Sequence, residues 1–373
     1  MKIGFDAKRA FSNTAGLGNF SRNSIIALTK QFPDNQYYLF NPGNRKPLFI
    51  APQSAIELKP ENMWWKTFSF VWRSLHISKI TKKLNLDIYH GLSHELPVGI
   101  EKTSTKSIVT IHDVIFLRYP EFYKKIDREI YDKKFRHACR VATRIHSISD
   151  QTKRDLIEYY GVPEEKITVI YQSINPIFFQ KVDPDFKFEL RKKHQLPKKF
   201  LLSVGTVESR KNLLGLLEGM IASKIYVPLV VVGKSTDYMQ KVQKFIEADL
   251  NRLQVFFLPR ISDDELVALY QMAEVMIYPS FFEGFGLPVA EAQASGCPVI
   301  TSNISSLPEA GGDAAFYVDP SMPEEIGEAL KTVLSDSSLR KSMIDKGKAN
   351  AHRFTHYSYA VQMEQLYKTV LNE

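Results

Sequence analysis

Two glutamates, Glu283 and Glu291, lie eight positions apart in a segment rich in glycine and proline. An apolar run at residues 275–278 precedes them, and Pro288 and Gly296 fit the first turn and the stop of a short helix. The pattern predicts a strand, a glycine-rich turn and a helix whose N-terminus faces the carboxyl edge of a sheet. Anionic ligands bind at such edges in α/β proteins.

The two carboxylates can serve different parts of one ligand. Glu291 falls on the first turn of the predicted helix, where a carboxylate can accept two hydroxyls of a ribose or another sugar. Glu283 lies in the turn itself, within reach of whatever is attached beyond the phosphates. A helix-capping turn with two solvated glutamates is the alternative, and the combination of both glutamates with the glycines and the proline makes it the minority view.

A pair of cations marks a second segment, where Gly205 follows an apolar run and Arg210 and Lys211 precede an apolar helical pattern. The turn after the first strand of a doubly wound domain is the expected phosphate position. Positive charge at a helix start is unfavourable against the dipole, so an anion held by both cations explains them better than solvation does. A diphosphate fits, because arginine binds it bidentately and lysine acts as a point charge.

Two weaker features lie in the first half of the chain. Gly16 and Gly18 would let a ligand approach the backbone, although a simple turn explains them equally well. They lack the third glycine of a dinucleotide fingerprint, which counts against a nicotinamide cofactor. His112 and Asp113 end a predicted central strand, where substrate contact and a purely structural histidine are about equally favoured.

No metal site or catalytic triad stands out in the sequence. His90 and His94 have no third ligand nearby, and the acidic pair at 183–185 is interpreted as a turn. Cys139 and Cys297 have no close partner in sequence, so neither a disulfide framework nor a zinc site is expected, and a reducing cytoplasm is the simplest location. We expect no metal and no other cofactor.

Length and composition fit two globular domains. The chain has 373 residues, of which 44% are hydrophobic and 24% charged, and it shows neither a signal peptide nor an apolar run of membrane-spanning length. The net charge of +8 indicates an anionic partner. Nucleic acid is not favoured, because no supporting motif is present, whereas a phosphate-rich ligand or an anionic membrane surface explains the charge.

Apolar strands alternate with helical patterns in two blocks, which predicts α/β units with parallel sheets. Strands are expected at 3–5, 37–40, 88–89, 107–111, 145–148 and 167–170, and then at 200–204, 229–232, 255–257, 275–278, 298–301 and 315–318. Helices are expected at 19–31, 66–84, 128–143 and 149–160, among others. The pattern breaks at 171–179, and its restart marks a second doubly wound domain, with a cleft expected between the facing carboxyl edges.

These motifs in combination resemble those of the family 4 glycosyltransferases. Glu283 to Glu291 resembles the family's two-glutamate motif, 205–212 its phosphate segment, and Gly16 with Gly18 its N-terminal glycine loop. The match runs over nearly the whole chain, and further matching segments are 110–113 with 119–121, as in the mannosyltransferase-like bacterial members, and 262–266 with Tyr270 and Ala273. The chain departs from the family pattern at 172–173 and 356–357, outside the motifs that resemble the donor site.

The resemblance implies the GT-B fold, with two Rossmann-like domains across a cleft. Residues 1–172, joined by a crossing helix at 355–373, would bind the acceptor, and 173–354 would bind a nucleotide sugar. It also implies retention of anomeric configuration without a metal. The expected catalytic residues are Arg210, Lys211, Glu283 and His112. The expected donor-binding residues are Gly16, Gly18, Gly205, Arg210, Lys211, Gly233, Arg260, Glu283, Gly284, Phe285, Gly286, Leu287 and Glu291.

The function expected from these features is hexose transfer, with mannose as one candidate, from a nucleoside diphosphate sugar to a saccharide or lipid-linked saccharide in surface-polysaccharide synthesis. Alternatives are a nucleotide-sugar epimerase, a phosphorylase, or a sugar-binding protein without chemistry. A phosphorylase would need a lysine-linked cofactor, for which no signature is seen. A binding protein would need a secretory signal and leaves Arg210 and Lys211 unexplained.

Contact with the inner face of the membrane is a further hypothesis. Trp65, Phe68 and Trp72 would share one face of the predicted helix, and the basic stretch 124–144 would assist binding to anionic lipids. Core packing of that face is the favoured alternative, because aromatics at helical spacing are usually buried.

Overall fold

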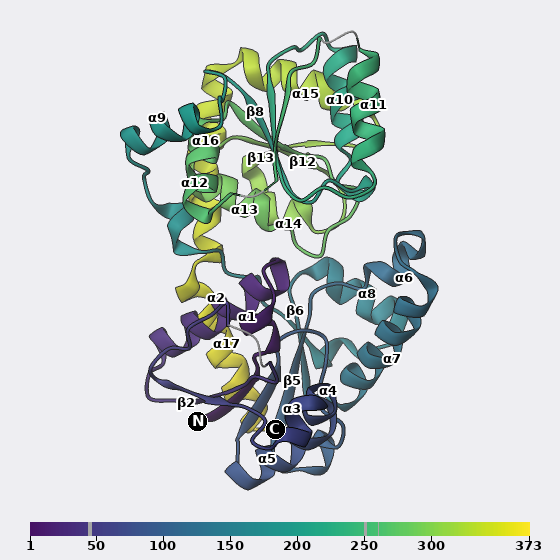
Figure 1. Ribbon diagram of the computed structural model, residues 1–373, viewed down its shortest axis with the longest axis vertical. Helices are drawn as coiled ribbons and strands as arrows, with labels where there is room; N and C mark the ends of the chain where they lie inside the picture. Colours follow the sequence, from purple (N-terminus) through teal and green to yellow (C-terminus); the bar gives the residue numbers. More distant parts are fainter. Residues whose placement is uncertain (44–46, 250–251, 260) are drawn as a thin grey trace. The chain divides into compact units, whose positions relative to one another are not determined.

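The computed structural model describes residues 1–43, 47–249, 252–259 and 261–373, and the chain divides into two compact units (Figure 1). Unit 1 comprises Met1–Ser173 and Phe354–Glu373, and unit 2 comprises Ile174–Arg353. The boundaries expected after residues 172 and 354 each lie within one residue of this division. Each unit is a parallel sheet flanked by helices, which confirms the predicted α/β class.

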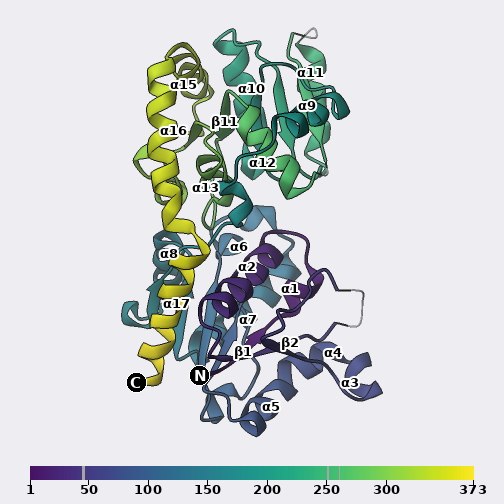
Figure 2. The same ribbon diagram turned by 90° about the vertical axis from the view of Figure 1, so that its left-hand side faces the viewer.

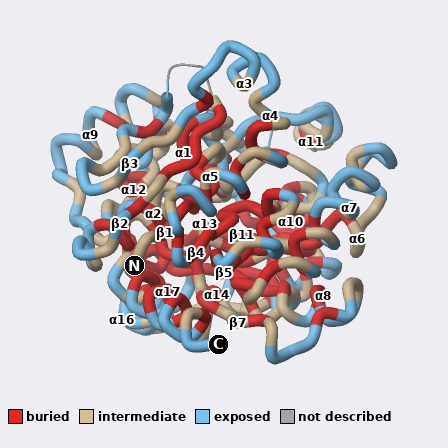
Figure 3. The backbone as a smooth tube through the Cα atoms, turned by 90° about the horizontal axis from the view of Figure 1, so that it is seen from below, coloured by how far each residue is buried: buried red, intermediate tan, exposed pale blue. Residues whose placement is uncertain are grey.

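Unit 1 is built on a seven-stranded parallel sheet in the order β3-β2-β1-β4-β5-β6-β7. The strands are β1 (Lys2–Asp6), β2 (Gln36–Phe40), β3 (Ala55–Leu58), β4 (Ile88–Gly91), β5 (Lys106–Ile111), β6 (Arg144–Ser147) and β7 (Ile167–Val169). The central strands are buried along most of their length (Figure 3). The edge strand β3 was not predicted, because it is short and largely solvent-accessible and so lacks a continuous apolar run.

The helices of unit 1 include one from the far end of the chain. They are α1 (Lys8–Ser12), α2 (Gly16–Gln31), α3 (Met63–Thr67), α4 (Ser69–Val71), a π-helical turn (Trp72–His76), α5 (Ile77–Leu84), α6 (Ile115–Arg118), α7 (Lys125–Val141), α8 (Asp150–Tyr160) and α17 (His356–Leu371). Short 3₁₀ turns cover Ile100–Lys102, Pro120–Phe122 and Glu164–Lys166. Ser149 and Thr355 cap α8 and α17 with their hydroxyls, and Figure 2 shows α17 beside α2.

The prediction of a single helix over residues 66–84 is wrong. Helix α3 ends at Thr67, and Phe68 leaves the helical conformation with φ −103° and ψ 49°. The run is rich in aromatic residues, which lose side-chain freedom in a helix, so packing decides its path. Trp72 is buried at 2% exposure, as core packing predicts, whereas Phe68 is 41% exposed. The residues on which the membrane hypothesis rested therefore do not form one exposed helix face, because Trp72 is buried and Phe68 is exposed.

Unit 2 contains a six-stranded parallel sheet in the order β10-β9-β8-β11-β12-β13. Its strands, all of which were predicted, are β8 (Leu201–Val204), β9 (Leu229–Val232), β10 (Val255–Leu258), β11 (Val275–Tyr278), β12 (Val299–Ser302) and β13 (Ala315–Val318). Its helices are α9 (Pro184–Lys193), α10 (Leu213–Ala222), α11 (Met239–Ala248), α12 (Asp263–Met272), α13 (Leu287–Ala294), α14 (Leu307–Gly311), α15 (Pro323–Ser335) and α16 (Ser337–Ala351). Further 3₁₀ turns are Pro176–Phe179, Ser209–Lys211, Gly312–Ala314 and, at the join, His352–Phe354.

The acidic pair at 183–185 begins a helix, although it was interpreted as a turn. Asp183 is the N-cap of α9, and its carboxylate accepts a hydrogen bond from the backbone N–H of Asp185. An aspartate that accepts N–H groups at a helix start is a stabilising cap.

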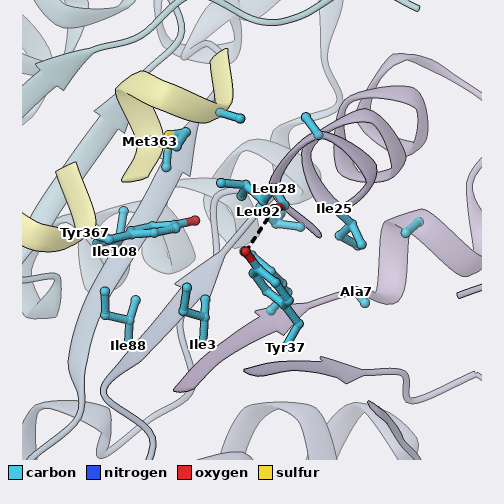
Figure 4. Close-up of a cluster of buried hydrophobic side chains, with 14 of the residues drawn as sticks. Ile3, Ala7, Ile25, Leu28, Tyr37, Ile88, Leu92, Ile108, Met363 and Tyr367 are labelled. Atoms are coloured by element: carbon cyan, nitrogen blue, oxygen red, sulfur yellow. Dashed lines mark hydrogen bonds between the residues drawn. The ribbon is translucent and has the colours of Figure 1, made fainter. Parts of the chain in front are cut away.

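The main core of unit 1 joins α17 to the sheet. Met363 and Tyr367 lie on the same side of the sheet as Ile88 and Ile108 (Figure 4). All four side chains are fully buried. The last helix is thus part of the core of unit 1.

A chain of buried hydrogen bonds crosses this core. His90 lies 2.8 Å from the Tyr367 hydroxyl through Nδ1 and 2.8 Å from Thr110 Oγ1 through Nε2. His146 lies 3.0 Å from Thr110 Oγ1 through Nδ1 and 2.8 Å from the Ile170 carbonyl through Nε2. A carbonyl only accepts, so Nε2 of His146 carries a proton and Nδ1 accepts from Thr110. It follows that Nε2 of His90 donates to Thr110 and that Tyr367 donates to Nδ1 of His90.

This one-directional chain requires both histidines to be neutral. Burial lowers the pKa of His146 to about 4 and holds the pKa of His90 well below its usual value. A proton added at either Nδ1 would face the donating hydroxyl of Tyr367 or Thr110. The chain therefore fixes the rotamer of each member and attaches α17 to β4, β5 and β6.

Tyr367→Phe should destabilise unit 1, because it leaves Nδ1 of His90 as a buried acceptor without a donor. The free energy of unfolding should fall by about 1–3 kcal/mol, measured by urea unfolding at pH 7.5. Tyr357→Phe, on the same helix but at a residue 63% exposed, is the matched control and should change stability by less than about 0.5 kcal/mol. Equal effects of the two substitutions would contradict a stabilising role for the hydrogen bond between Tyr367 and His90.

Candidate functional site

The candidate site lies at the carboxyl edge of the unit 2 sheet, in the loops after β8 and β11. Arg210 and Lys211 lie in the 3₁₀ turn Ser209–Lys211, which precedes α10. Glu283 lies in the turn between β11 and α13. Because β8 and β11 pair directly in the sheet, the two loops emerge side by side. The two cations and the first glutamate singled out in the sequence are thus brought together.

Glu283 holds both cations through one oxygen. Its Oε1 lies 2.6 Å from Lys211 Nζ and 2.9 Å from Arg210 Nη1, and it accepts a hydrogen bond of 3.0 Å from the Tyr278 hydroxyl. Lys211 also donates to the Tyr278 hydroxyl, and Arg210 pairs with Glu208 at 2.6 Å. In this structure, the anion that both cations share is the Glu283 carboxylate.

Burial and charge act in opposite directions on this cluster. Burial would raise the pKa of Glu283, but Lys211 and Arg210 lower it to about 2. Burial lowers the pKa of Lys211, and the Glu283 carboxylate partly offsets that effect. The side chains of Glu283, Arg210 and Lys211 are only 10%, 16% and 17% exposed. Glu283 is therefore an ionised carboxylate shielded from water.

Two serines after β12 hold the backbone of Glu283. Ser305 Oγ accepts from the Glu283 N–H at 3.0 Å and donates to the Glu283 carbonyl at 2.8 Å. Ser306 Oγ lies 2.9 Å from the carbonyls of both Glu283 and Phe285. Ser305 has a φ of +63°, and such left-handed conformations of non-glycine residues cluster at functional sites. Neither serine, nor Tyr278 at the end of β11, was singled out in the sequence.

The turn after Glu283 requires glycine at its last position. Gly286 is the N-cap of α13 with a φ of +108°, and a Cβ there would lie 2.8 Å from Leu307 Cδ2. Gly284 and the buried Phe285 precede it, and Leu287 is the first residue of α13. This conformation, which glycine adopts readily, starts α13 in the loop after β11. The N-terminus of α13 therefore lies at the carboxyl edge of the sheet, as the sequence predicted.

A second close approach joins the loops after β8 and β9. Gly233 has a φ of +155°, and a Cβ there would lie 1.9 Å from the carbonyl oxygen of Gly205. Any side chain at position 233 would push this loop away from the one that leads to Arg210. Gly205 and Gly233 therefore allow two loops at the edge of the site to pack backbone against backbone.

Glu291 lies farther along α13 than expected. It is the fifth residue of the helix, at the start of the second turn rather than on the first. Its Oε2 accepts a hydrogen bond of 3.3 Å from the Tyr270 hydroxyl. Burial, with a contribution from Asp263, raises the pKa of Glu291 to about 8. A carboxyl group with this pKa has both a donor and an acceptor form near neutral pH, and either form can bind a sugar hydroxyl.

The remaining predicted residues belong to unit 1, with one exception. Gly16 and Gly18 lie in the first turn of α2, not in a loop before it, because α2 begins at Gly16. His112 follows β5 at 5% exposure, and its Nε2 donates to the Leu92 carbonyl at 3.0 Å. Burial lowers the pKa of His112 to about 4, so the ring is neutral. Arg260 lies outside the described residues.

Neither a metal centre nor a membrane-spanning helix is found in the described ranges of the chain. Among these residues, no group of three or more His, Cys, Asp or Glu is arranged to hold a metal ion. The helices of the same ranges include none that is long and apolar enough to cross a membrane. Both cysteines are buried and free.

Known protein families match both halves of the chain. A model described as Glycosyltransferase Family 4 matches residues 23–177, and one described as Glycosyl transferases group 1 matches residues 186–350. The O-antigen chain mannosyltransferase RfbU of Salmonella typhimurium is 30% identical over 273 residues, which cover 72% of this chain and 70% of that protein. The O-antigen chain mannosyltransferase B of Escherichia coli is 29% identical over 286 residues, 75% and 74% of the two chains.

Solved structures share the two-unit architecture. A glycosyltransferase from Rickettsia africae superimposes with a TM-score of 0.76 at 19% identity and covers 100% of this chain and 99% of its own. HepE of Anabaena, solved with UDP and glucose, superimposes with a TM-score of 0.75 at 17% identity, covering 99% and 100%. At these identities the likeness shows the fold.

Proposed function

Because this chain belongs to the family 4 glycosyltransferases and has the GT-B fold, we propose that it transfers a hexose from a nucleoside diphosphate sugar to a hydroxyl of a saccharide. The observation that carries this proposal is the cluster of Arg210, Lys211 and Glu283 at the carboxyl edge of the unit 2 sheet. The two relatives named O-antigen mannosyltransferases support mannose as the sugar and a growing surface polysaccharide, free or lipid-linked, as the acceptor.

The chemistry of the proposed reaction is assisted departure of the diphosphate. The bond between C1 of the sugar and the diphosphate oxygen breaks, and negative charge develops on the leaving group. Preorganised cations and N–H donors stabilise such charge most effectively where water is excluded. Arg210, Lys211 and the N-terminus of α13 supply these groups in a buried setting.

Retention follows in this proposal if the acceptor oxygen joins C1 from the side that the diphosphate leaves. The acceptor proton then passes to the departing phosphate oxygen, which balances the reaction without a protein nucleophile. Glu291 would bind the ribose, and Glu283 would orient the hexose. Unit 1 would bind the acceptor, with His112 contacting the sugar from that side.

Arg210→Ala and Lys211→Ala should each reduce turnover at saturating acceptor by at least about tenfold, because each removes a donor to the developing charge. Thermal shift with GDP-, UDP- and ADP-sugars identifies the donor first, since a bound ligand stabilises the folded state. Lys331→Ala, which removes a half-exposed lysine paired with Glu328 on α15, is the control and should retain full activity. Wild-type rates in both site variants would place the diphosphate elsewhere.

The reaction should need no divalent metal, because Arg210 and Lys211 supply the positive charge that a metal would otherwise bring to the diphosphate. Transfer rates measured in excess EDTA should equal those without it. Activity that is lost in EDTA and restored by Mg²⁺ or Mn²⁺ would contradict this mechanism.

Unit 1 carries an exposed aromatic surface that differs from the face on which the sequence-based hypothesis of membrane contact rested. Met63, Trp64 and Phe70 are 77%, 56% and 69% exposed, and the rings of Trp64 and Phe68 lie 4.7 Å apart. Lys66 is exposed on the same short helix. Aromatic and cationic side chains together favour the interface of an anionic bilayer. We propose that this surface brings the enzyme to a lipid-linked acceptor.

The double substitution Trp64→Ser/Phe70→Ser should weaken flotation with phosphatidylglycerol vesicles at low salt, because it removes the most exposed aromatic area. Phe188→Ser, at a residue 65% exposed on α9 of unit 2, removes one phenylalanine ring about as exposed as that of Phe70 and should leave flotation unchanged. Binding of the wild-type protein should fall as salt is added. A wild-type protein that does not float at low salt would refute the membrane contact.

A further inference from the structure

The charged side chains of the proposed donor site form a cluster without net charge. Arg210 and Lys211 are matched by two carboxylates, Glu283 on both cations and Glu208 on Arg210. The pairing distances of 2.6 to 2.9 Å are those of charge-assisted hydrogen bonds. A diphosphate that approaches this cluster therefore meets cations that are already neutralised.

Glu283 occupies the position that a phosphate oxygen would seek. A single oxygen, Oε1, faces Arg210 Nη1, Lys211 Nζ and the Tyr278 hydroxyl. Phosphate oxygens bind the same kinds of donor at the same distances. The cluster is largely shielded from water. A diphosphate can therefore accept the hydrogen bonds that these three donors now make to Oε1 only if the carboxylate gives them up.

The backbone of Glu283 is held in place, so its carboxylate would leave the cations by rotation of the side chain. Its backbone N–H and carbonyl are held by Ser305, and its carbonyl also by Ser306. When the carboxylate leaves the cations, it needs other hydrogen-bond donors, because an unpaired buried carboxylate is strongly unfavourable. The hydroxyls of a hexose attached to the diphosphate are such donors.

We propose that Glu283 is an internal counter-ion that competes with the diphosphate, so that the site binds the intact sugar nucleotide in preference to the bare nucleoside diphosphate. This inference rests on the proposed function of the site. The intact donor supplies anions for the cations and hydroxyls for the displaced carboxylate. After transfer the hydroxyls leave with the sugar, Glu283 returns to Arg210 and Lys211, and the nucleoside diphosphate is released.

The test compares two dissociation constants for each protein by calorimetry without acceptor. The probes are GDP, UDP and ADP, each with its sugar conjugate (GDP-mannose, UDP-glucose, ADP-glucose). Glu283→Gln keeps the shape and the ability to bind hydroxyls but removes the competing charge. It should tighten binding of the nucleoside diphosphate by about ten- to a hundredfold and tighten the sugar conjugate much less, or weaken it.

Two controls separate this role from a general change of charge. Glu328→Gln removes one carboxylate on α15 and should alter neither constant. Glu208→Gln removes the carboxylate that contacts only Arg210 among the site cations, and should tighten both ligands by a similar factor, leaving their ratio unchanged. Thermal unfolding of each variant reports whether it is folded.

The outcomes are distinct. Binding of a nucleoside diphosphate that is equal or weaker in Glu283→Gln than in the wild type, with the sugar conjugate still bound, overturns the counter-ion role and leaves the proposed function standing. Failure of the wild type and all variants to bind any probe overturns the proposed function and this inference with it. A nucleoside diphosphate that binds Glu283→Gln but not the wild type supports the inference.

Discussion

The proposed donor site depends on the direct pairing of β8 with β11. These strands are separated in sequence by β9 and β10, yet they are neighbours at the centre of the sheet. Parallel strands end at the same edge, so the turn that carries Arg210 and Lys211 meets the turn that carries Glu283. Gly233 lets the loop after β9 come close to the loop after β8, and the positive φ of Gly286 lets α13 begin directly after the turn that carries Glu283.

Much of the fold could be predicted because buried parallel strands are continuous apolar runs. The four inner strands of unit 2 are almost entirely buried, and its two edge strands, β10 and β13, are apolar runs that are only partly buried. The prediction failed where that signal is weak or misleading. β3 is a half-exposed edge strand, and the helix expected at 66–84 breaks at Phe68 because aromatic packing around Trp72, not periodicity, determines the path of the chain there.

The three charged residues of the cluster were singled out from the sequence, but their partners were not. Glycine spacing and an unfavourable pair of cations pointed to Glu283, Arg210 and Lys211 from local sequence alone. The contact between Lys211 and Glu283 joins residues 72 positions apart, and the serines that hold Glu283 follow a different strand. Such contacts depend on strand order, which local patterns do not specify.

The internal pairing reconciles two demands on the site. Two adjacent buried cations without anions would repel each other and lose hydration, so a vacant donor site would destabilise unit 2. The Glu283 carboxylate removes that penalty in the free protein. The same carboxylate competes with any anion for Arg210 and Lys211. An anion that brings no hydrogen-bond donors for the displaced carboxylate is therefore disfavoured. Under the proposed counter-ion role, a single buried glutamate couples the stability of the empty site to discrimination between the sugar nucleotide and the nucleoside diphosphate.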